Sequence, residues 1–414
     1  MSISINSFTV NGKTYTPPAR PIVVICLDGS ADEYLDTTMA HDRMPNLKKM
    51  VLAGYRGMVR GALPSFTNVN NSSIVTGVTP AVHGICGNFF YDTNRKEEVM
   101  MNSAEYLRAE TILAAAANAG RKVAVVTAKE KLRDILSHKM TGIAFSAEKA
   151  NQAQEATHGI GNVETVLDLK TPAIYSADAS LFVLRAGVAL IEKGLGDFLY
   201  LSLTDYMQHT FAPEDEPSLA FYEAIDHELG RLLALGAVIG ATADHGMNAK
   251  QKADGSPNVL YIETMLTEQF GNGFRVICPI TDPYVKHHGA LGSYVAVHVP
   301  ENVDETAVSD WLQQQPGITE VHNKAMAVRL LEQPEDRIAD LVVLSARDVV
   351  VGRTPAHHDL SALDSGLRSH GGRYEEMVPL LISHPLKAAY KSKAAGDPRN
   401  FDVFDFTVNG TSHN

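Results

Sequence analysis

Seven side chains in this sequence combine residue types that bind catalytic metals with a hydroxyl that suits a nucleophile. They are Asp28, Thr67, Asp205, His209, Asp244, His245 and His370. Asp205 and His209 are four residues apart, and residues at that spacing share one face of a helix, where both can bind one ion. Mixed carboxylate and imidazole ligands are typical of catalytic zinc, although manganese and iron also use them. The set therefore predicts metal-dependent catalysis.

Two of these groups lie in turns that glycine makes possible. Asp244 and His245 are adjacent and precede Gly246, which lets the backbone bend so that both side chains face one metal. His370 precedes a pair of glycines in the same way. Taken singly, an aspartate at a strand end is more often a helix cap, and a single histidine is usually a surface or core residue. The complete set in this chain order favours a metal site.

Thr67 lies in a polar stretch that leads into a predicted helix. A threonine at that position has an ordinary structural role, because its hydroxyl can cap the helix. The alternative is that the hydroxyl is a nucleophile activated by a metal. The residues that follow, from Thr76 to Asp92, favour the second interpretation through the resemblance described below.

The elements that would position these residues follow a βα pattern. Predicted strands are continuously apolar and rich in β-branched residues, as in a parallel sheet covered on both faces. They span Ile22–Leu27, Lys122–Val126, Phe198–Leu203 and Ala237–Thr242, with helices predicted over 44–53, 104–119 and 218–235. This alternation predicts an α/β fold with a mostly parallel central sheet flanked by helices. Three of the strands are followed by an aspartate, at the end where such sheets bind ligands.

A long segment between the fourth strand and His370 breaks this alternation. It contains predicted strands at Ser293–Val299, Thr319–His322 and Asp340–Ser345, and predicted helices at Glu305–Gln314 and Lys324–Leu331. We therefore predict two domains. The catalytic core would comprise residues 1–254 plus 365–414, with a further core strand at Val378–Ser383. Residues 255–364 would form an inserted α+β cap beside the active site.

Composition limits the classes of function. The formal net charge of −12 argues against broad binding of nucleic acid, which needs a basic face, whereas bound metals can still attract a small anion. No uncharged apolar stretch approaches the ~20 residues that a membrane span requires. Met1–Pro18 lacks the pattern of a secretory signal, so we expect a cytoplasmic protein without membrane partners. Cys26 and the other two cysteines do not suggest a disulfide framework, and we expect Cys26 to be buried. The oligomeric state stays open, with a homodimer as the assembly considered.

The order of these motifs resembles the alkaline phosphatase superfamily. The order begins with Asp28 and Thr67 and continues with Thr76–Asn88, whose sequence is Thr-Gly-x-x-Pro-x-x-His-Gly-Ile-x-Gly-Asn. An Asp-x-x-x-His pair, Asp-His-Gly-Met and His-Gly-Gly follow. The chain is most similar to the branch of nucleotide pyrophosphatases and phosphodiesterases, and within that branch it resembles the phosphonoacetate hydrolases. Three segments carry this last resemblance: Thr127–Arg133, Asp282–Gly289 and Ser369–Glu375.

This resemblance implies two zinc ions per chain and a role for each ligand. One zinc would be bound by Asp205, His209 and His370. The other would be bound by Asp28, Asp244 and His245, joined by Thr67 as an alkoxide. Asn88 would donate hydrogen bonds to a phosphoryl oxygen. The implied reaction is hydrolysis of phosphonoacetate to acetate and phosphate through a phospho-threonine intermediate.

Cleavage of a carbon–phosphorus bond adds a requirement for cations. The departing carbon cannot leave as a bare carbanion, but the carboxylate of phosphonoacetate can accept the charge as an enediolate. The positive charge of two zinc ions is already balanced by three aspartates and a threonine alkoxide. We therefore expect Lys129 and Lys131, just after a strand end, and His288 in the insertion to contact the substrate. The structural alternative for the two lysines is a solvated helix start, and the alternative for His288 is an ordinary surface histidine.

Three other functions share parts of this pattern. A phosphodiesterase that cleaves nucleotides would need an aromatic slot for a base. A phosphomutase has the same metal core but isomerises sugar phosphates. A metal-binding phosphate sensor without catalysis is the alternative from a different class, and the threonine beside the complete ligand set argues against it.

Overall fold

A seven-stranded sheet forms the centre of the protein in a computed structural model that describes residues 3–282, 288–361, 363 and 366–412. The strand order is β4-β19-β10-β3-β9-β7-β8. The strands span Tyr55–Arg60, Met377–Ile382, Val238–Thr242, Ile22–Cys26, Phe198–Ser202, Val123–Thr127 and Ile143–Ser146 in that order. The five strands from β10 to β8 are parallel, and β19 is antiparallel to both of its neighbours, β10 and β4. The predicted α/β class is confirmed.

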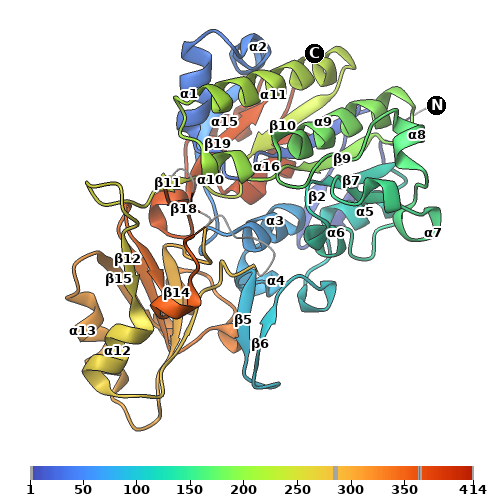
Figure 1. The fold of residues 1–414 in the computed structure, drawn as a ribbon. Coiled ribbons are helices and arrows are strands. Elements are labelled where there is room, and N and C mark those ends of the chain that lie inside the picture. The colour runs from blue at the N-terminus through green and yellow to red at the C-terminus, as the bar shows by residue number, and fades with distance from the viewer. Residues whose placement is uncertain (1–2, 283–287, 362, 364–365, 413–414) are drawn as a thin grey trace.

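Helices cover both faces of the central sheet (Figure 1), and alternate residues of its central strands enter two different apolar cores. In β3, Val23 and Ile25 enter one apolar core, and Ile22, Val24 and Cys26 enter the other, so both faces are buried. The first core is closed by α1 Asp32–Ala40, α2 Pro45–Ala53, α8 Val163–Leu167, α9 Ala177–Glu192 and α11 Glu216–Ala234. The second is closed by α3 Thr67–Thr76, α5 Ile112–Asn118, α6 Glu130–Leu136 and α16 Val403–Val408.

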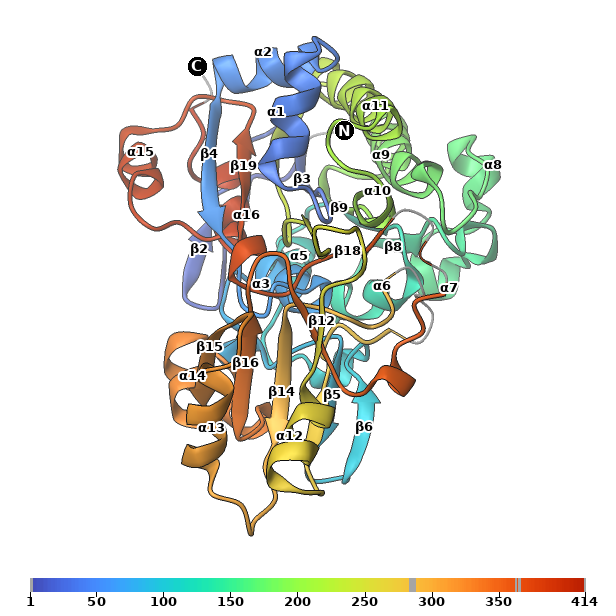
Figure 2. The same cartoon turned by 60° about the vertical axis from the view of Figure 1, so that its left-hand side comes forward.

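A second, antiparallel sheet lies at one end of the molecule, as Figure 2 shows in its lower half. Its order is β13-β14-β16-β15, with bounds Arg275–Ile277, Tyr294–His298, Leu341–Ser345 and Ile318–Asn323. It packs with α12 Ile262–Phe270, α13 Glu305–Gln313 and α14 Lys324–Leu330. The same apolar core includes Leu63, Phe66 and Val69, which flank Thr67 in the chain. The packing of this second sheet therefore helps to fix the backbone around Thr67.

The remaining elements are short. Two-stranded pairings join β1 Phe8–Val10 with β2 Lys13–Tyr15, β5 Phe89–Asp92 with β6 Glu97–Met100, β11 Asn248–Ala249 with β18 Arg368–Ser369, and β12 Val259–Tyr261 with β17 Val350–Gly352. The short helices are α4 Pro80–His83, α7 Glu155–His158, α10 Tyr206–Thr210 and α15 Ala388–Ala394. The β11–β18 pair joins the chain entering the second sheet to the chain returning from it.

Several predicted elements differ from the observed ones. The helix predicted over 104–119 is wrong in its first half, where the structure has a 3₁₀ turn at Ala104–Tyr106. The helix itself begins after Thr111, because the Thr111 hydroxyl caps it by accepting a hydrogen bond from the backbone NH of Ala114. Prediction also missed the long helix α9 and the outer strands β4 and β8. Cys26 is fully buried, as predicted.

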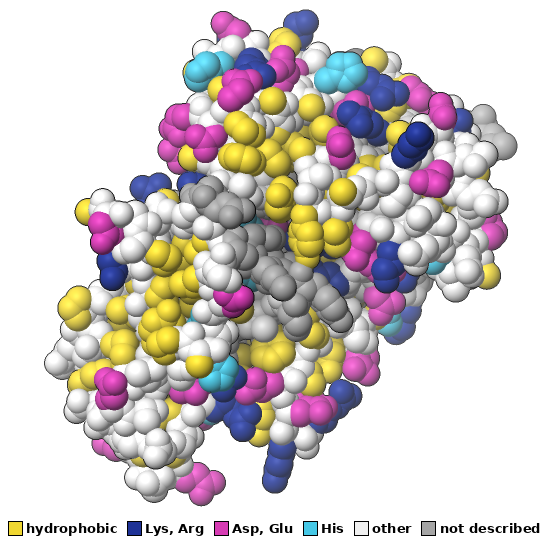
Figure 3. All heavy atoms as spheres, viewed as in Figure 1, with side chains coloured by type: hydrophobic (Ala, Val, Ile, Leu, Met, Phe, Trp, Pro, Cys, Tyr) yellow, Lys and Arg dark blue, Asp and Glu magenta, His cyan; other side chains and the backbone are white. Residues whose placement is uncertain are grey.

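On the molecular face drawn in Figure 3, acidic and basic side chains are interspersed over the surface. Among the described residues, no helix combines the length and the apolar character that crossing a membrane would require.

Candidate metal centre and active site

Three neighbouring strands of the central sheet each end beside one of the predicted aspartates. The strands β10, β3 and β9 are adjacent and parallel. Asp28 follows β3, Asp205 follows β9 and Asp244 follows β10, and all three carboxylates are buried. Because the carboxyl ends of parallel strands meet at one edge of the sheet, these three aspartates are brought together by topology alone.

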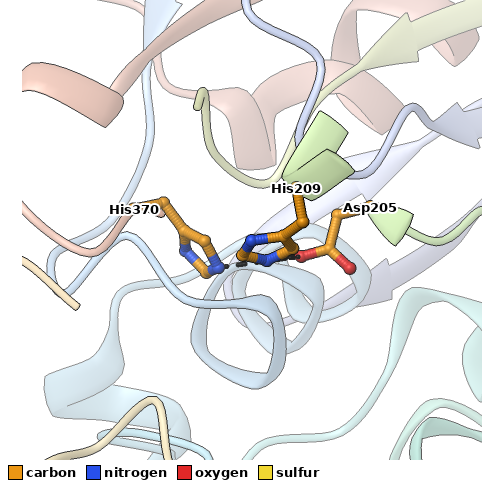
Figure 4. A group of neighbouring side chains, drawn as sticks. All are labelled: Asp205, His209 and His370. Atoms are coloured by element: carbon orange, nitrogen blue, oxygen red, sulfur yellow. Dashed lines mark ion pairs between the residues drawn. The ribbon is translucent and has the colours of Figure 1, made fainter. Parts of the chain in front are cut away.

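The first cluster joins Asp205, His209 and His370, whose potential ligand atoms all lie within 4.8 Å of one another (Figure 4). Asp205 immediately precedes the short helix α10, and His209 lies in that helix. The Nε2 atom of His209 lies 3.0 Å from Oδ2 of Asp205, and the Nε2 atom of His370 lies 3.7 Å from the same oxygen. His370 lies more than a hundred residues later in the chain than His209, so the cluster forms only in the folded protein.

The second cluster joins Asp28, Asp244 and His245 within the same limit of 4.8 Å. The Nε2 atom of His245 lies 3.4 Å from Oδ1 of Asp28 and 3.6 Å from Oδ2 of Asp244. The hydroxyl of Thr67 lies 3.4 Å from the same imidazole nitrogen. The structure therefore places the Thr67 hydroxyl beside the second cluster.

Backbone carbonyls orient all three imidazole rings. Nδ1 of His209 lies 2.8 Å from the carbonyl oxygen of Arg368. Nδ1 of His245 lies 2.9 Å from the carbonyl oxygen of Gly246, and Nδ1 of His370 lies 2.7 Å from that of Ser65. A carbonyl oxygen only accepts hydrogen bonds, so Nδ1 is the protonated nitrogen in each ring. Nε2 is then the nitrogen that faces the carboxylates, which is how metal-binding histidines are usually held.

Charge is crowded in these clusters. Burial, then Asp205 and Asp244, raise the pKa of Asp28 well above its usual range. Burial and Asp205 raise the pKa of Asp244 to about 7. Burial also acts to raise the pKa of Asp205, but Lys129 and His209 hold it well below the usual value. Burial, together with His245 and His209, lowers the pKa of His370, which favours the neutral imidazole that a metal requires.

The donor set fits divalent cations. Among the described residues, Oδ1 of Asp28 is buried without a hydrogen-bond partner, which costs free energy unless an ion or other donor serves it. Three carboxylates and three imidazoles in two adjoining groups match the preferences of zinc and similar metals. The two clusters are therefore candidate sites for two metal ions.

The helix that begins at Thr67 is unusually polar for a buried helix. Every residue of α3 is buried, and two of its polar side chains, Thr67 and Asn71, contact the second cluster. Asn71 donates hydrogen bonds to the Thr67 carbonyl, at 3.1 Å, and to Oδ2 of Asp244, at 3.2 Å. The Asn71 side-chain oxygen accepts hydrogen bonds from Tyr200 and Ser202. Asn71 thus links the helix of Thr67 to the second cluster, a role that our sequence analysis missed.

Asn88 is buried next to the start of the same helix. Its side-chain oxygen accepts a hydrogen bond of 3.1 Å from the backbone NH of Asn68. This contact fixes the orientation of the side-chain amide, so that its NH₂ group is the donor. Asn88 is therefore hydrogen-bonded to the residue that follows Thr67, a position where the resemblance expects a donor to a phosphoryl oxygen.

Both predicted lysines lie at the site, just after β7 and beside the first cluster. Nζ of Lys129 lies 3.3 Å from Oδ1 of Asp205. Lys131 forms an ion pair with Asp282, a buried residue of the predicted insertion. A cavity of about 300 Å³ adjoins the two lysines and Asp282, and Tyr175 forms part of its wall. Burial and Lys129 lower the pKa of Lys131, and Asp282 opposes this shift.

His288 also lies beside the first cluster. It is buried, and its ring centroid lies 5.2 Å from that of the first-cluster residue His209. Its Nδ1 accepts a hydrogen bond from the backbone NH of Ala290. The neighbouring His287 lies outside the described residues.

Comparison with known proteins gives one family and several relatives. The family model of type I phosphodiesterase / nucleotide pyrophosphatase matches residues 22–372. A curated relative, ectonucleotide pyrophosphatase/phosphodiesterase family member 3 of Bos taurus, is 35% identical over 86 residues, which are 20% of this chain and 10% of that protein. A venom phosphodiesterase of Macrovipera lebetinus is 27% identical over 223 residues, which are 51% of this chain and 23% of that enzyme. The chain thus spans only a small part of these curated relatives.

Solved structures give a match over the full length. The chain is 44% identical to phosphonoacetate hydrolase from Sinorhizobium meliloti 1021, solved in complex with phosphonoacetate, with a TM-score of 0.94 and coverage of 99% of this chain and 100% of that one. The same enzyme in complex with phosphonoformate matches equally well. Murine ectonucleotide pyrophosphatase / phosphodiesterase 5 has a TM-score of 0.65 at 16% identity, covering 95% of this chain and 97% of that one, and shows the shared fold alone.

Proposed function

Because this chain belongs to the family of type I phosphodiesterases and nucleotide pyrophosphatases, we propose that it is a di-metal hydrolase of phosphonoacetate. The products would be acetate and phosphate. The observation that carries this proposal is the similarity, over the full length and at 44% identity, to an enzyme solved with phosphonoacetate bound. The two ligand clusters beside Thr67 and the paired lysines support it independently.

In this proposal two zinc ions occupy the two clusters. Asp205, His209 and His370 would hold one ion, and Asp28, Asp244, His245 and the Thr67 oxygen would hold the other. Bound zinc would lower the pKa of a coordinated hydroxyl and offset the negative charge of a phosphoryl group. The mixed carboxylate and imidazole ligands favour zinc, and manganese or iron are the alternatives that metal analysis must distinguish.

Thr67 would act as the nucleophile. Its oxygen would form a bond to phosphorus as the carbon–phosphorus bond breaks, which leaves a phospho-threonine. The electron pair of the broken bond passes to the substrate carboxylate as an enediolate, which takes a proton from solvent to give acetate. Water then cleaves the phospho-threonine and releases phosphate. The position of Thr67 at the start of α3 suits this step, because the positive end of a helix dipole favours a phosphoryl group.

The remaining residues would bind and orient the substrate. Asn88 would donate to a phosphoryl oxygen. Lys129, Lys131 and His288 would contact the carboxylate, where negative charge grows as the bond breaks, so that their contacts strengthen in the transition state. We further propose that residues 255–364 form a cap over the core of residues 1–254 plus 365–414. The contacts of Asp282 with Lys131 and of His288 with His209 support this division.

A phosphodiesterase or nucleotide pyrophosphatase of the same family is the second candidate. It is favoured by the family model and by the venom phosphodiesterases among the relatives. A panel of three substrates separates the candidates: phosphonoacetate, a nitrophenyl phosphodiester and a sugar phosphate. Our proposal predicts the highest kcat/KM for phosphonoacetate. A higher value for the diester would instead identify a phosphodiesterase.

A further inference from the structure

A buried carboxylate, Glu375, lies between the two turns that carry His245 and His370. Its side chain is fully buried. Its backbone carbonyl accepts a hydrogen bond of 2.8 Å from the NH of Gly246, and its Oε2 accepts one of 3.1 Å from the NH of Gly372. Gly246 follows His245 directly, and Gly372 lies two residues after His370. One residue thus contacts both of the turns that present ligands to the two clusters.

From these two contacts, short chains of hydrogen bonds lead to both imidazole rings. On one side, the carbonyl of Gly246 binds Nδ1 of His245. On the other side, the carbonyl of Gly372 accepts a hydrogen bond of 2.9 Å from the Ser65 hydroxyl, and the carbonyl of Ser65 binds Nδ1 of His370. Ser65 is two residues before Thr67. The orientation of His245 therefore depends on the backbone of Gly246, which the carbonyl of Glu375 holds. The orientation of His370 depends on the backbone of Ser65, which is held by Gly372, the partner of the Glu375 carboxylate.

The second oxygen of Glu375 is held just as firmly. Its Oε1 accepts a hydrogen bond of 2.6 Å from the side chain of Asn248 and one of 2.9 Å from Nζ of Lys250. Lys250 is itself fully buried and donates to the carbonyl of Arg347. Arg347 in turn donates to the side-chain oxygen of Asn248. This network ties the returning chain of the proposed cap to the same carboxylate.

The energetic cost of this arrangement argues for a specific role. Burying an ion pair such as Lys250–Glu375 removes two charges from water, and an apolar pair of similar size often stabilises a fold as well or better. What an apolar pair lacks is direction: it cannot accept hydrogen bonds from Gly372 and Asn248 at fixed angles. Groups that orient metal ligands in this way commonly have a large effect on metal affinity.

We propose that Glu375 is a positioning residue that sets the orientation of His245 and His370, and with it the spacing of the two metal sites. This inference rests on the proposed two-metal centre. It assigns Glu375 no contact with the substrate. The carboxylate acts on the turn at Gly372, and the backbone carbonyl of Glu375 holds the turn at Gly246. Lys250 and Asn248 hold the carboxylate itself.

The test is the zinc affinity of a Glu375→Gln variant, measured by competition with a chelating dye. Glutamine has the same shape, but its NH₂ group must face either the donors Asn248 and Lys250 or the NH of Gly372. We expect the zinc dissociation constant to rise by about tenfold to a hundredfold. With zinc in excess, kcat for phosphonoacetate should fall while KM changes little, because the substrate contacts remain.

A matched control is Glu228→Gln, which removes another buried glutamate that pairs with Arg231 and Arg185 on the surface of the helical layer. It should lower the melting temperature and leave zinc affinity unchanged. If Glu375→Gln does not fold, Asn248→Ala removes one donor to the same carboxylate and should still weaken zinc binding several-fold.

Wild-type zinc affinity in Glu375→Gln and Asn248→Ala would overturn the proposal. So would a loss of affinity that Glu228→Gln reproduces. A wild-type protein that binds two zinc ions but leaves phosphonoacetate intact would refute only the proposed substrate, since the zinc titrations still decide the role of Glu375. A wild-type protein that binds no zinc would refute both.

Discussion

The imidazole rings of His245 and His370 lie face to face, with centroids 3.5 Å apart and planes inclined by 5°. Each ring belongs to a different ligand cluster, so the two candidate metal sites are in direct contact through these rings. A displacement of either turn must therefore disturb both sites. This relationship joins the two candidate metal sites and the nearby Thr67 hydroxyl in a single centre, and the following predictions test its parts.

Metal content is the first prediction. Protein purified without chelators should contain about two zinc equivalents per chain. Dialysis against a chelator should abolish turnover and lower the melting temperature, because Asp28, Asp205 and Asp244 then repel one another without a cation between them. Elemental analysis and thermal unfolding measure the two effects, and restored zinc should reverse both. Full activity in protein shown to be metal-free would contradict the account.

The role of Thr67 can be tested by two substitutions. Thr67→Ala removes the nucleophile and should reduce kcat on the order of 10⁴-fold or more, with the fold retained. Thr67→Ser is the matched control, because it keeps a hydroxyl and should keep measurable activity. Circular dichroism checks the fold of both variants. Turnover by Thr67→Ala near the wild-type rate would show that another group attacks phosphorus.

The lysines should distinguish phosphonoacetate from simple esters. Replacing Lys129 or Lys131 by alanine removes a charge-assisted contact worth roughly 1.5–3 kcal/mol. If that contact strengthens in the transition state, kcat/KM for phosphonoacetate should fall by about tenfold to a few hundredfold. A nitrophenyl ester has no carboxylate and should be affected far less.

Lys149→Ala is the matched control for this pair, since Lys149 lines the same cavity. It should leave both substrates unchanged. Equal losses on both substrates in Lys129→Ala and Lys131→Ala would show that these lysines serve the phosphoryl group or the fold. If neither variant affects either substrate, the carboxylate is bound elsewhere, and the better candidate becomes His288 or Lys286, which lies outside the described residues.

The lowered pKa of Lys131 predicts a pH dependence of binding. Burial and the nearby Lys129 favour the neutral amine of Lys131, so its pKa lies below the usual 10.5. Only the protonated form attracts a carboxylate, so KM for phosphonoacetate should rise as pH increases through this lowered pKa. Lys131→Arg should remove the rise, because a guanidinium stays charged at every accessible pH. An unchanged KM–pH profile in Lys131→Arg would exclude Lys131 as its source.

Strand topology made much of the site predictable. Asp28, Asp205 and Asp244 follow buried apolar strands, and the parallel arrangement of those strands places them at one edge. The division of these aspartates between two clusters does not follow from spacing and came from the family resemblance. The cytoplasmic location and the assembly state stay predictions from the sequence.

Other parts of the site depend on contacts that no local pattern reveals. Glu375 meets Gly246 and Lys250 only because the chain returns from the second sheet at β18. Asp282 reaches Lys131 across a similar distance in sequence. The sequence did contain one signal for Asn71: it follows Thr67 by four residues, a spacing that places both side chains on the same face of a helix.

The most direct test of the central claim is a product analysis of the zinc-loaded protein with phosphonoacetate. Phosphorus NMR follows the conversion of the phosphonate to inorganic phosphate, and proton NMR follows the methyl group of acetate in the same tube. We predict that phosphate and acetate appear in equal amounts, and that Thr67→Ala under the same conditions forms neither. An unchanged phosphonoacetate spectrum, from protein that contains two zinc equivalents and rapidly cleaves a nitrophenyl phosphodiester, would contradict the account.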